Sequence, residues 1–149
     1  MRASTRRLCS AGLGVIRART GGAVTHTASR ERVIIEKYGR NSFEISGVDL
    51  RGAVLVFPSF ALLWNVRTAA EIVPGAFVAL TTLNPRPDLL LLGLGDQGTA
   101  ALPRQALHAL QLTGIPFEVS DTPSSLNTFN VLNAESRLVC AALLPVQTL

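Results

Sequence analysis

The sequence predicts an α/β domain built around a mixed β-sheet. From Leu89 onward, three apolar strand patterns alternate with two helix patterns, which is typical of parallel strands joined by helical crossovers. Upstream, a hairpin and further short strand patterns predict antiparallel strands in the same domain. With 149 residues, of which 48% are hydrophobic, the chain is long and apolar enough for one globular domain but not for two.

The first half of the domain is predicted to consist of strands. Residues 32–38 are rich in β-branched side chains, and residues 42–45 alternate between polar and apolar. Ser46 and Gly47 then favour a turn that returns the chain along residues 48–50, which predicts a hairpin. The remaining strands of this half are expected at residues 53–57, a continuous apolar run that predicts burial on both faces, and at residues 61–66.

Prolines mark the predicted helices of the second half. Pro74, Pro103 and Pro123 each suit the first position of a helix, where a backbone N–H is not needed. Thr122 is the predicted N-cap of the last helix, and Gly114 is expected to end the middle one in a left-handed conformation. The expected elements are helices at 74–80, 103–113 and from 122 onward, a loop at 84–87, and strands at 89–92, 115–119 and 138–144.

Positive charge is concentrated at the N-terminus. Residues 1–30 hold six of the 14 Lys and Arg residues and no Asp or Glu, which leaves eight basic and ten acidic side chains, a net of −2, for residues 31–149. The Arg-rich, acid-free segment predicts a mitochondrial transit peptide, with a disordered basic tail as the alternative. Because the basic residues of the body are scattered singly, we expect the body not to bind nucleic acid. The folded domain is expected at residues 31–149.

The sequence predicts no transmembrane segment. Its longest uncharged run, residues 52–66, is interrupted by Pro58. At about 1.5 Å per residue, a helix of that length falls short of the roughly 30 Å hydrocarbon core of a bilayer.

A glycine-rich turn is the sharpest local motif. Gly93, Gly95 and Gly98 fit the pattern G-x-G-x-x-G after a predicted strand, and Asp121 follows Gly98 by 23 positions. In a dinucleotide-binding protein such a turn holds pyrophosphate and such a carboxylate holds the ribose. Here the next helix is predicted to start too late, at 103, and Asp96 places a carboxylate where phosphates would lie. We therefore expect a flexible strand-to-loop turn and no cofactor, with a nucleotide or another small molecule on these five residues as the alternative.

The sequence contains no recognisable catalytic or metal-binding set. Of its two histidines, His26 lies in the basic segment and His108 on a helix face predicted to contact water. Cys140 lies within an apolar strand, which predicts a buried, inert thiol. Asp96 and Asp121 both follow strands predicted to be parallel, so a carboxylate pair is an alternative, but Asp121 is more simply explained as part of a helix cap. We expect no catalytic residues and no metal site.

Trp64 is a candidate interface residue. It is the single tryptophan of the chain, and tryptophan is either a core residue or, when partly exposed, a favoured anchor for a protein partner. Because a domain of this size leaves much of its apolar surface uncovered, an exposed apolar patch is expected near Trp64 or on the outer helices.

With these motifs in place, the body resembles the Mth938-like domain family over roughly residues 34–145. The residues that carry the resemblance are Phe43–Gly47, Trp64–Val66, Gly93, Gly95, Asp96, Asp121–Pro123, Thr128–Asn130, Leu132, Glu135 and Arg137. Two small residues depart from the family pattern. Ser136 stands where the family prefers glycine, which makes a positive φ at that corner more strained, and Ser125 stands where it prefers alanine.

The resemblance implies a three-layer α/β fold around a five-stranded mixed sheet. Its closest branch implies a non-enzymatic role in assembling the ubiquinone-binding arm of mitochondrial complex I. The implied place is the matrix, peripheral to the inner membrane, and the implied partners are complex I subunits and a second assembly factor. Two alternatives stay open: an accessory subunit retained in a mitochondrial complex, and a small-molecule or nucleotide-binding protein that uses the turn at residues 93–98.

Overall fold

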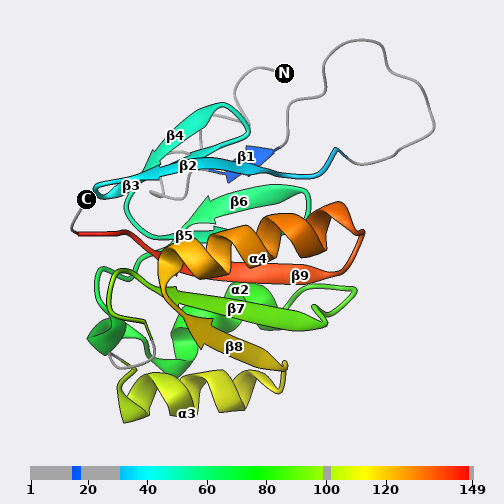
Figure 1. Ribbon diagram of the computed structural model, residues 1–149. Coiled ribbons are helices and arrows are strands. Elements are labelled where there is room, and N and C mark those ends of the chain that lie inside the picture. The colour runs from blue at the N-terminus through cyan, green and yellow to red at the C-terminus, as the bar shows by residue number, and fades with distance from the viewer. Residues whose placement is uncertain (1–14, 18–30, 99–101, 148–149) are drawn as a thin grey trace, which may run out of the picture.

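A six-stranded mixed sheet forms the centre of the molecule (Figure 1). The computed structural model describes residues 15–17, 31–98 and 102–147. In sheet order the strands are β1 (Val15–Arg17), β6 (Phe60–Leu63), β5 (Val54–Val56), β9 (Val139–Leu144), β7 (Leu89–Leu94) and β8 (Phe117–Ser120). Strand β9 pairs in parallel with β7 and antiparallel with β5, so the strand direction changes there. The predicted mixed sheet is confirmed, and β5 to β9 are its five strands from the body.

Strand β1 comes from the basic N-terminal segment. It pairs antiparallel with β6 and forms one edge of the sheet. The rest of the predicted transit peptide, residues 1–14 and 18–30, lies outside the described residues, so that assignment stays a prediction.

A smaller antiparallel sheet contains β2 (Ile35–Gly39), β3 (Ser42–Ile45) and β4 (Val48–Arg51). Strands β3 and β4 form the predicted hairpin, and Ser46 and Gly47 both take positive φ in its turn. The first strand begins at Ile35 rather than Arg32. The Val33 N–H donates to the Pro58 carbonyl (2.9 Å), so this residue is tied to a loop instead of to β3.

Helices cover both faces of the central sheet, which gives the three layers that the resemblance implied (Figure 1). Helix α4 (Thr122–Ala134) packs on one face, over β7 and β9, and the core on this face also includes residues of the smaller sheet. On the other face lie α3 (Arg104–Thr113) and the short helices η1 (Ala69–Glu71), η2 (Pro74–Phe77) and α2 (Val78–Thr81). Within the described ranges, no helix is both long enough and apolar enough to cross a membrane.

Side-chain alternation in the central strands separates two cores. In β9, Cys140, Ala142 and Leu144 enter the core beneath α3, whereas the residues between them enter the core beneath α4. Strand β7 divides in the same way, with Leu90 facing α3 and Leu91 facing α4. Burial of each such leucine contributes about 1.5–3 kcal/mol, which is why these apolar runs form the centre of the sheet.

Three helices differ from the sequence prediction, two of them at their start and one in its type. Asp121, not Thr122, is the N-cap of α4, because its carboxylate accepts the Ser124 N–H (2.7 Å) while Thr122 is fully buried. Pro103 precedes α3 with an extended backbone instead of being its first helical residue. The helix expected at 74–80 is a 3₁₀ turn followed by one α-helical turn, because Phe77 departs from helical geometry between them.

The two serines that depart from the family pattern are both accommodated. Ser136 takes φ +65 at the corner after α4, so this position does require the left-handed conformation that glycine adopts at low cost. Ser125 is buried and its hydroxyl pairs with that of Ser120 (2.6 Å), so the added polar group is satisfied. Gly114, at φ +66, ends α3 as predicted.

Candidate functional site

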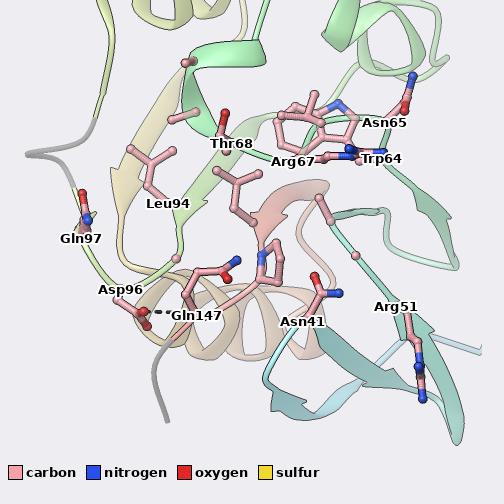
Figure 2. A pocket seen from close by; sticks show the side chains of 18 of the residues that line it. Asn41, Arg51, Trp64, Asn65, Arg67, Thr68, Leu94, Asp96, Gln97 and Gln147 are labelled. Atoms are coloured by element: carbon pink, nitrogen blue, oxygen red, sulfur yellow. Dashed lines mark hydrogen bonds between the residues drawn. The ribbon is translucent and has the colours of Figure 1, made fainter.

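A groove of about 960 Å³ opens where the carboxyl ends of β7 and β9 meet the smaller sheet (Figure 2). In α/β proteins this edge of parallel strands is where binding sites are most often built. The floor includes apolar residues at or just beyond the strand ends, among them Leu94, Leu144 and Pro145. The loop after β6, from Trp64 to Ala70, supplies one wall, and Asn41 and Arg51 of the smaller sheet supply another.

The structure brings three of the predicted candidates to this groove. Trp64, Gly95 and Asp96 line it, whereas Gly93, Gly98 and Asp121 do not. The groove therefore brings the candidate interface residue, Trp64, together with the middle of the glycine turn, Gly95 and Asp96. These two features are about thirty residues apart in the sequence, and the sequence alone did not indicate that they meet.

Trp64 is mainly a core residue that presents an edge to the groove. Only 7% of it is exposed, its indole N–H donates to the Ala76 carbonyl (3.0 Å), and its ring lies beside that of Phe77 with centroids 5.6 Å apart. A partner can contact the edge of this ring but cannot bury it further. The role of Trp64 as an interface residue stays a prediction, and the exposed groups beside it offer more contact area.

The glycine turn is held by the first residue of α4. The Thr122 hydroxyl accepts the Gly95 N–H (2.8 Å) and donates to the Leu144 carbonyl (2.6 Å), and the Thr122 N–H donates to the Gly95 carbonyl (2.9 Å). The turn itself is as predicted, but these bonds fix it rather than leave it flexible. They also occupy the Gly95 N–H, one of the backbone donors that a phosphate would need.

Close packing explains the first glycine of the motif. A Cβ at Gly93 would lie 2.9 Å from the Leu143 side chain and 3.0 Å from both Cα and Oγ1 of Thr122. Gly95 and Gly98 take positive φ, at +65 and +57. The glycine spacing is therefore explained by contact with α4 and by turn geometry.

Replacement of Gly93 with alanine is expected to lower the free energy of unfolding by about 2 kcal/mol, because the added methyl group overpacks a site closed by backbone. Urea denaturation of the purified domain measures the change. Gly75→Ala is the matched control, since a Cβ there meets nothing within 4 Å and its expected effect is within about 0.5 kcal/mol. Equal midpoints for the two variants would contradict the packing argument.

The two aspartates have separate structural roles. Asp121 caps α4, and hydrogen bonding from the Ser124 side chain and backbone lowers the pKa of its carboxyl group below the ordinary value. Asp96 is exposed at the groove, where its carboxylate accepts the Gln147 N–H (3.1 Å; Figure 2). The structure thus supports the helix-cap interpretation of Asp121 over a carboxylate pair.

The Asp121 cap predicts a pH effect on stability. Because the folded-state pKa of Asp121 is lowered, its contribution is present above the ordinary pKa and is lost as the pH falls through the folded value. Asp121→Asn keeps an oxygen for the Ser124 N–H but does not titrate. The stability advantage of the natural chain over this variant is therefore expected to shrink between about pH 6 and about pH 2. Chemical denaturation across this range measures it; an advantage that grows toward low pH would contradict the assignment.

Cys140 and His108 lie where the sequence predicted them. Cys140 is buried, and burial raises the pKa of its thiol to about 12, so it is protonated and inert at neutral pH. His108 is exposed on α3. Across the described part of the chain, no group of three or more His, Cys, Asp or Glu residues is placed to hold a metal ion.

The polar rim of the groove was not predicted from the sequence. Its exposed members beside Asp96 are Asn41, Arg51, Asn65, Arg67, Thr68, Gln97 and Gln147. They come from loops and strand ends that are far apart in the chain, and they share no motif. The one available signal was the position of Asn65 directly after Trp64.

Comparison with known proteins agrees with this geometry. A solution structure of a Bordetella pertussis protein described as a Mth938-like domain has a TM-score of 0.61 at 24% identity, covering 84% of this chain and 92% of that one. A crystal structure of a Bordetella parapertussis protein has a TM-score of 0.68 at 28% identity, covering 79% of this chain and 99% of that one. The three-layer fold is thus that of a Mth938-like domain.

Similarity in sequence identifies the family to which the chain belongs. The profile of the family described as "Protein of unknown function (DUF498/DUF598)" matches residues 35–144, and the chain belongs to this family. A human relative named NADH dehydrogenase (ubiquinone) 1 alpha subcomplex assembly factor 3 is 33% identical over 127 residues, which are 85% of this chain and 68% of the relative. A zebrafish relative of the same name is also 33% identical over 127 residues.

Proposed function

We propose that this protein is a non-enzymatic assembly factor of mitochondrial complex I that acts through protein–protein contacts. The observation that carries the proposal is the similarity to relatives named complex I assembly factor 3, which extends over 85% of this chain. The Arg-rich, acid-free N-terminal segment supports a mitochondrial location independently of those names.

The chemistry of the site also supports a contact role. The polar groups nearest the glycine turn are used to hold the fold: Thr122 bridges the turn and β9, and Asp121 caps α4. The other exposed polar groups of the lining are mainly amides and arginines, with the Thr68 hydroxyl and the hydrogen-bonded Asp96 carboxylate, and such a mixture suits recognition of another protein surface. We place the protein in the matrix, peripheral to the inner membrane, where it assists the ubiquinone-binding arm together with complex I subunits and a second assembly factor.

Deletion of the gene in cells of the source organism, followed by native gel electrophoresis, tests the proposal. Mature complex I is expected to fall and partial assemblies of its ubiquinone-binding arm to accumulate, while other respiratory complexes stay unchanged. Re-expression of the chain with a C-terminal affinity tag should restore the complex and recover its subunits. Unchanged complex I in the deletion strain would overturn the proposal. Comigration of the tagged chain with mature complex I would identify a retained subunit instead of an assembly factor.

A thermal-shift measurement tests the alternative that the protein binds a nucleotide or another small molecule. A ligand at about 100 times its dissociation constant adds about 2.7 kcal/mol to the free energy of unfolding. We expect no shift with NAD or FAD. A clear shift that Asp96→Asn abolishes would favour a ligand-binding protein over an assembly factor.

A further inference from the structure

The groove has an excess of open positive charge. Arg51 and Arg67 line it, and within the described ranges neither guanidinium has a hydrogen-bond or ion-pair partner in the chain. Figure 2 shows Arg67 beside Trp64, whereas Arg51 lies on β4 with its side chain directed away from Trp64 and Arg67, at the outer end of the lining. Two acids close to the lining in sequence or space carry hydrogen bonds: Glu71 accepts the Arg67 backbone N–H (2.8 Å), and Asp96, which lines the groove, accepts the Gln147 N–H. The groove is therefore suited to carboxylate groups brought by a ligand.

The rest of the lining suits a peptide main chain and an apolar side chain. Asn41, Asn65, Gln97 and Gln147 are exposed at the rim, and in the described part of the chain their side-chain amides make no internal hydrogen bond. Each amide offers both donors and an acceptor, as a peptide backbone requires. The buried floor around Leu94 offers apolar contact between them.

The same lining is poorly suited to a small ligand. Small-molecule sites depend on a few positioned polar groups inside the pocket. The buried polar residues of the described chain are Thr113, Thr122, Ser125 and Asn133, and none of them lines the groove. Nucleic acid is disfavoured by the net charge of −2 on residues 31–149.

We infer that this groove binds an extended acidic segment of a partner protein. A carboxylate of the segment pairs with Arg67, a second acidic residue lies near Arg51, and an apolar side chain rests on the floor beside Leu94. The inference rests on the proposed function, since it assigns the chemistry of the contact by which the assembly factor holds its partner.

Binding of a defined peptide tests the inference with purified protein. The probe is a fluorescein-labelled decapeptide with four glutamates and two leucines among serines, and its counterparts carry glutamine or lysine in place of glutamate. The glutamate peptide alone is expected to bind, and more weakly as salt is raised. Arg67→Glu should raise its Kd about tenfold or more, because a charged hydrogen bond is replaced by repulsion, and Arg67→Lys should raise it less.

The matched control reverses charge outside the groove. Lys37→Glu with Arg137→Glu changes the net charge as much as Arg51→Glu with Arg67→Glu, and both control residues are exposed and do not line the groove. The control pair should leave the Kd within about twofold, since surface charges beyond a Debye length of about 8 Å are screened. Equal weakening by the two pairs, or equal binding of the glutamine peptide, would overturn the inference. Unchanged melting temperatures establish that all variants are folded.

Photo-crosslinking in mitochondria tests the same contact with the natural partner. Benzoylphenylalanine in place of Asn65 should capture peptides rich in Asp and Glu, and their yield should fall when Arg67→Glu is added. The same probe in place of Gln111, exposed on the outer face of α3, should not capture them. Crosslinks at Asn65 that go to neutral or basic segments, or to lipid, would overturn the inference.

The results of these experiments distinguish a failure of this inference from a failure of the proposed function. If Arg51→Glu with Arg67→Glu restores complex I in the deletion strain and keeps the same crosslinks, the groove assignment is wrong and the assembly role stands. If deletion leaves complex I unchanged, the assembly role is wrong, and the peptide measurement still decides whether the groove binds acidic segments.

Discussion

Replacement of Thr122 with valine is expected to lower the free energy of unfolding by about 4 kcal/mol, since two buried backbone groups lose their partner. Its hydroxyl accepts the Gly95 N–H (2.8 Å) and donates to the Leu144 carbonyl (2.6 Å), and the residue is fully buried. Valine has nearly the same shape, so the loss isolates the hydroxyl from the packing. Urea denaturation followed by circular dichroism measures it.

Thr122→Ser is the control for this prediction. It keeps the hydroxyl and removes one methyl group, so it should cost only about 1 kcal/mol. If valine is tolerated as well as serine, the hydroxyl does not hold the turn. Because the Thr122 bonds set the floor of the groove, Thr122→Val should also weaken binding of the acidic peptide before the domain unfolds.

Replacement of Asn133 with alanine is the second change of large expected effect. The side-chain amide donates to the Val33 (2.9 Å) and Pro58 (3.2 Å) carbonyls and accepts from Arg32 (2.9 Å). Alanine leaves the buried Val33 carbonyl unpaired and a cavity between α4 and the chain entering β2, whereas the Pro58 carbonyl keeps the Val33 N–H, so we expect a loss of about 3 kcal/mol in the free energy of unfolding.

Two variants on the same helix calibrate that loss. Asn127 is exposed on α4, and its side chain makes no hydrogen bond within the described part of the chain, so Asn127→Ala should change stability by at most about 0.5 kcal/mol. Asn130 bonds both the N–H (3.0 Å) and the carbonyl (2.8 Å) of Ile35 but is only partly buried, so Asn130→Ala should fall between the two. If Asn133→Ala lowers the free energy of unfolding by no more than Asn127→Ala does, the Asn133 amide does not stabilise the contact between α4 and the chain that enters β2.

These contacts give a physical meaning to the motif from Thr128 to Asn130. On the sequence, Phe129 was identifiable as a core residue from helical spacing, and it is fully buried. Asn130 carried the family resemblance but no assignable role. The structure shows that it acts as a strand neighbour for Ile35, since its amide pairs with both backbone groups of that residue. Such a role depends on a partner 95 positions away, which periodicity cannot reveal.

The strands were predictable where a local pattern determines them. The apolar run at β9 and the alternation at β3 each fix the burial of a strand through a period of two, and both strands lie where expected. Helix starts were predicted less well, because Thr122 and Asp121 are both good caps by residue type. Which of them caps α4 was decided by the burial of Thr122 against β9, a tertiary contact.

In the candidate site, too, some features were predictable from a local pattern and others depended on tertiary contacts. The glycine turn was visible as a motif, and its role as a turn was predictable from the distance to the next helix. The positions of Arg51, Arg67 and Asn41 around the groove were not, because they come from different elements whose order in space is set by pairing of strands distant in sequence.

By itself, then, the sequence determined the α/β class, the buried central strands, the hairpin, the buried Cys140 and the concentration of positive charge in residues 1–30, because each follows from local pattern or composition. Only the tertiary structure decided that Thr122 fastens the glycine turn, that Trp64 is largely enclosed and that open arginines and amides gather in one groove. Those features depend on contacts between segments far apart in the chain, and such contacts are set by how the layers pack.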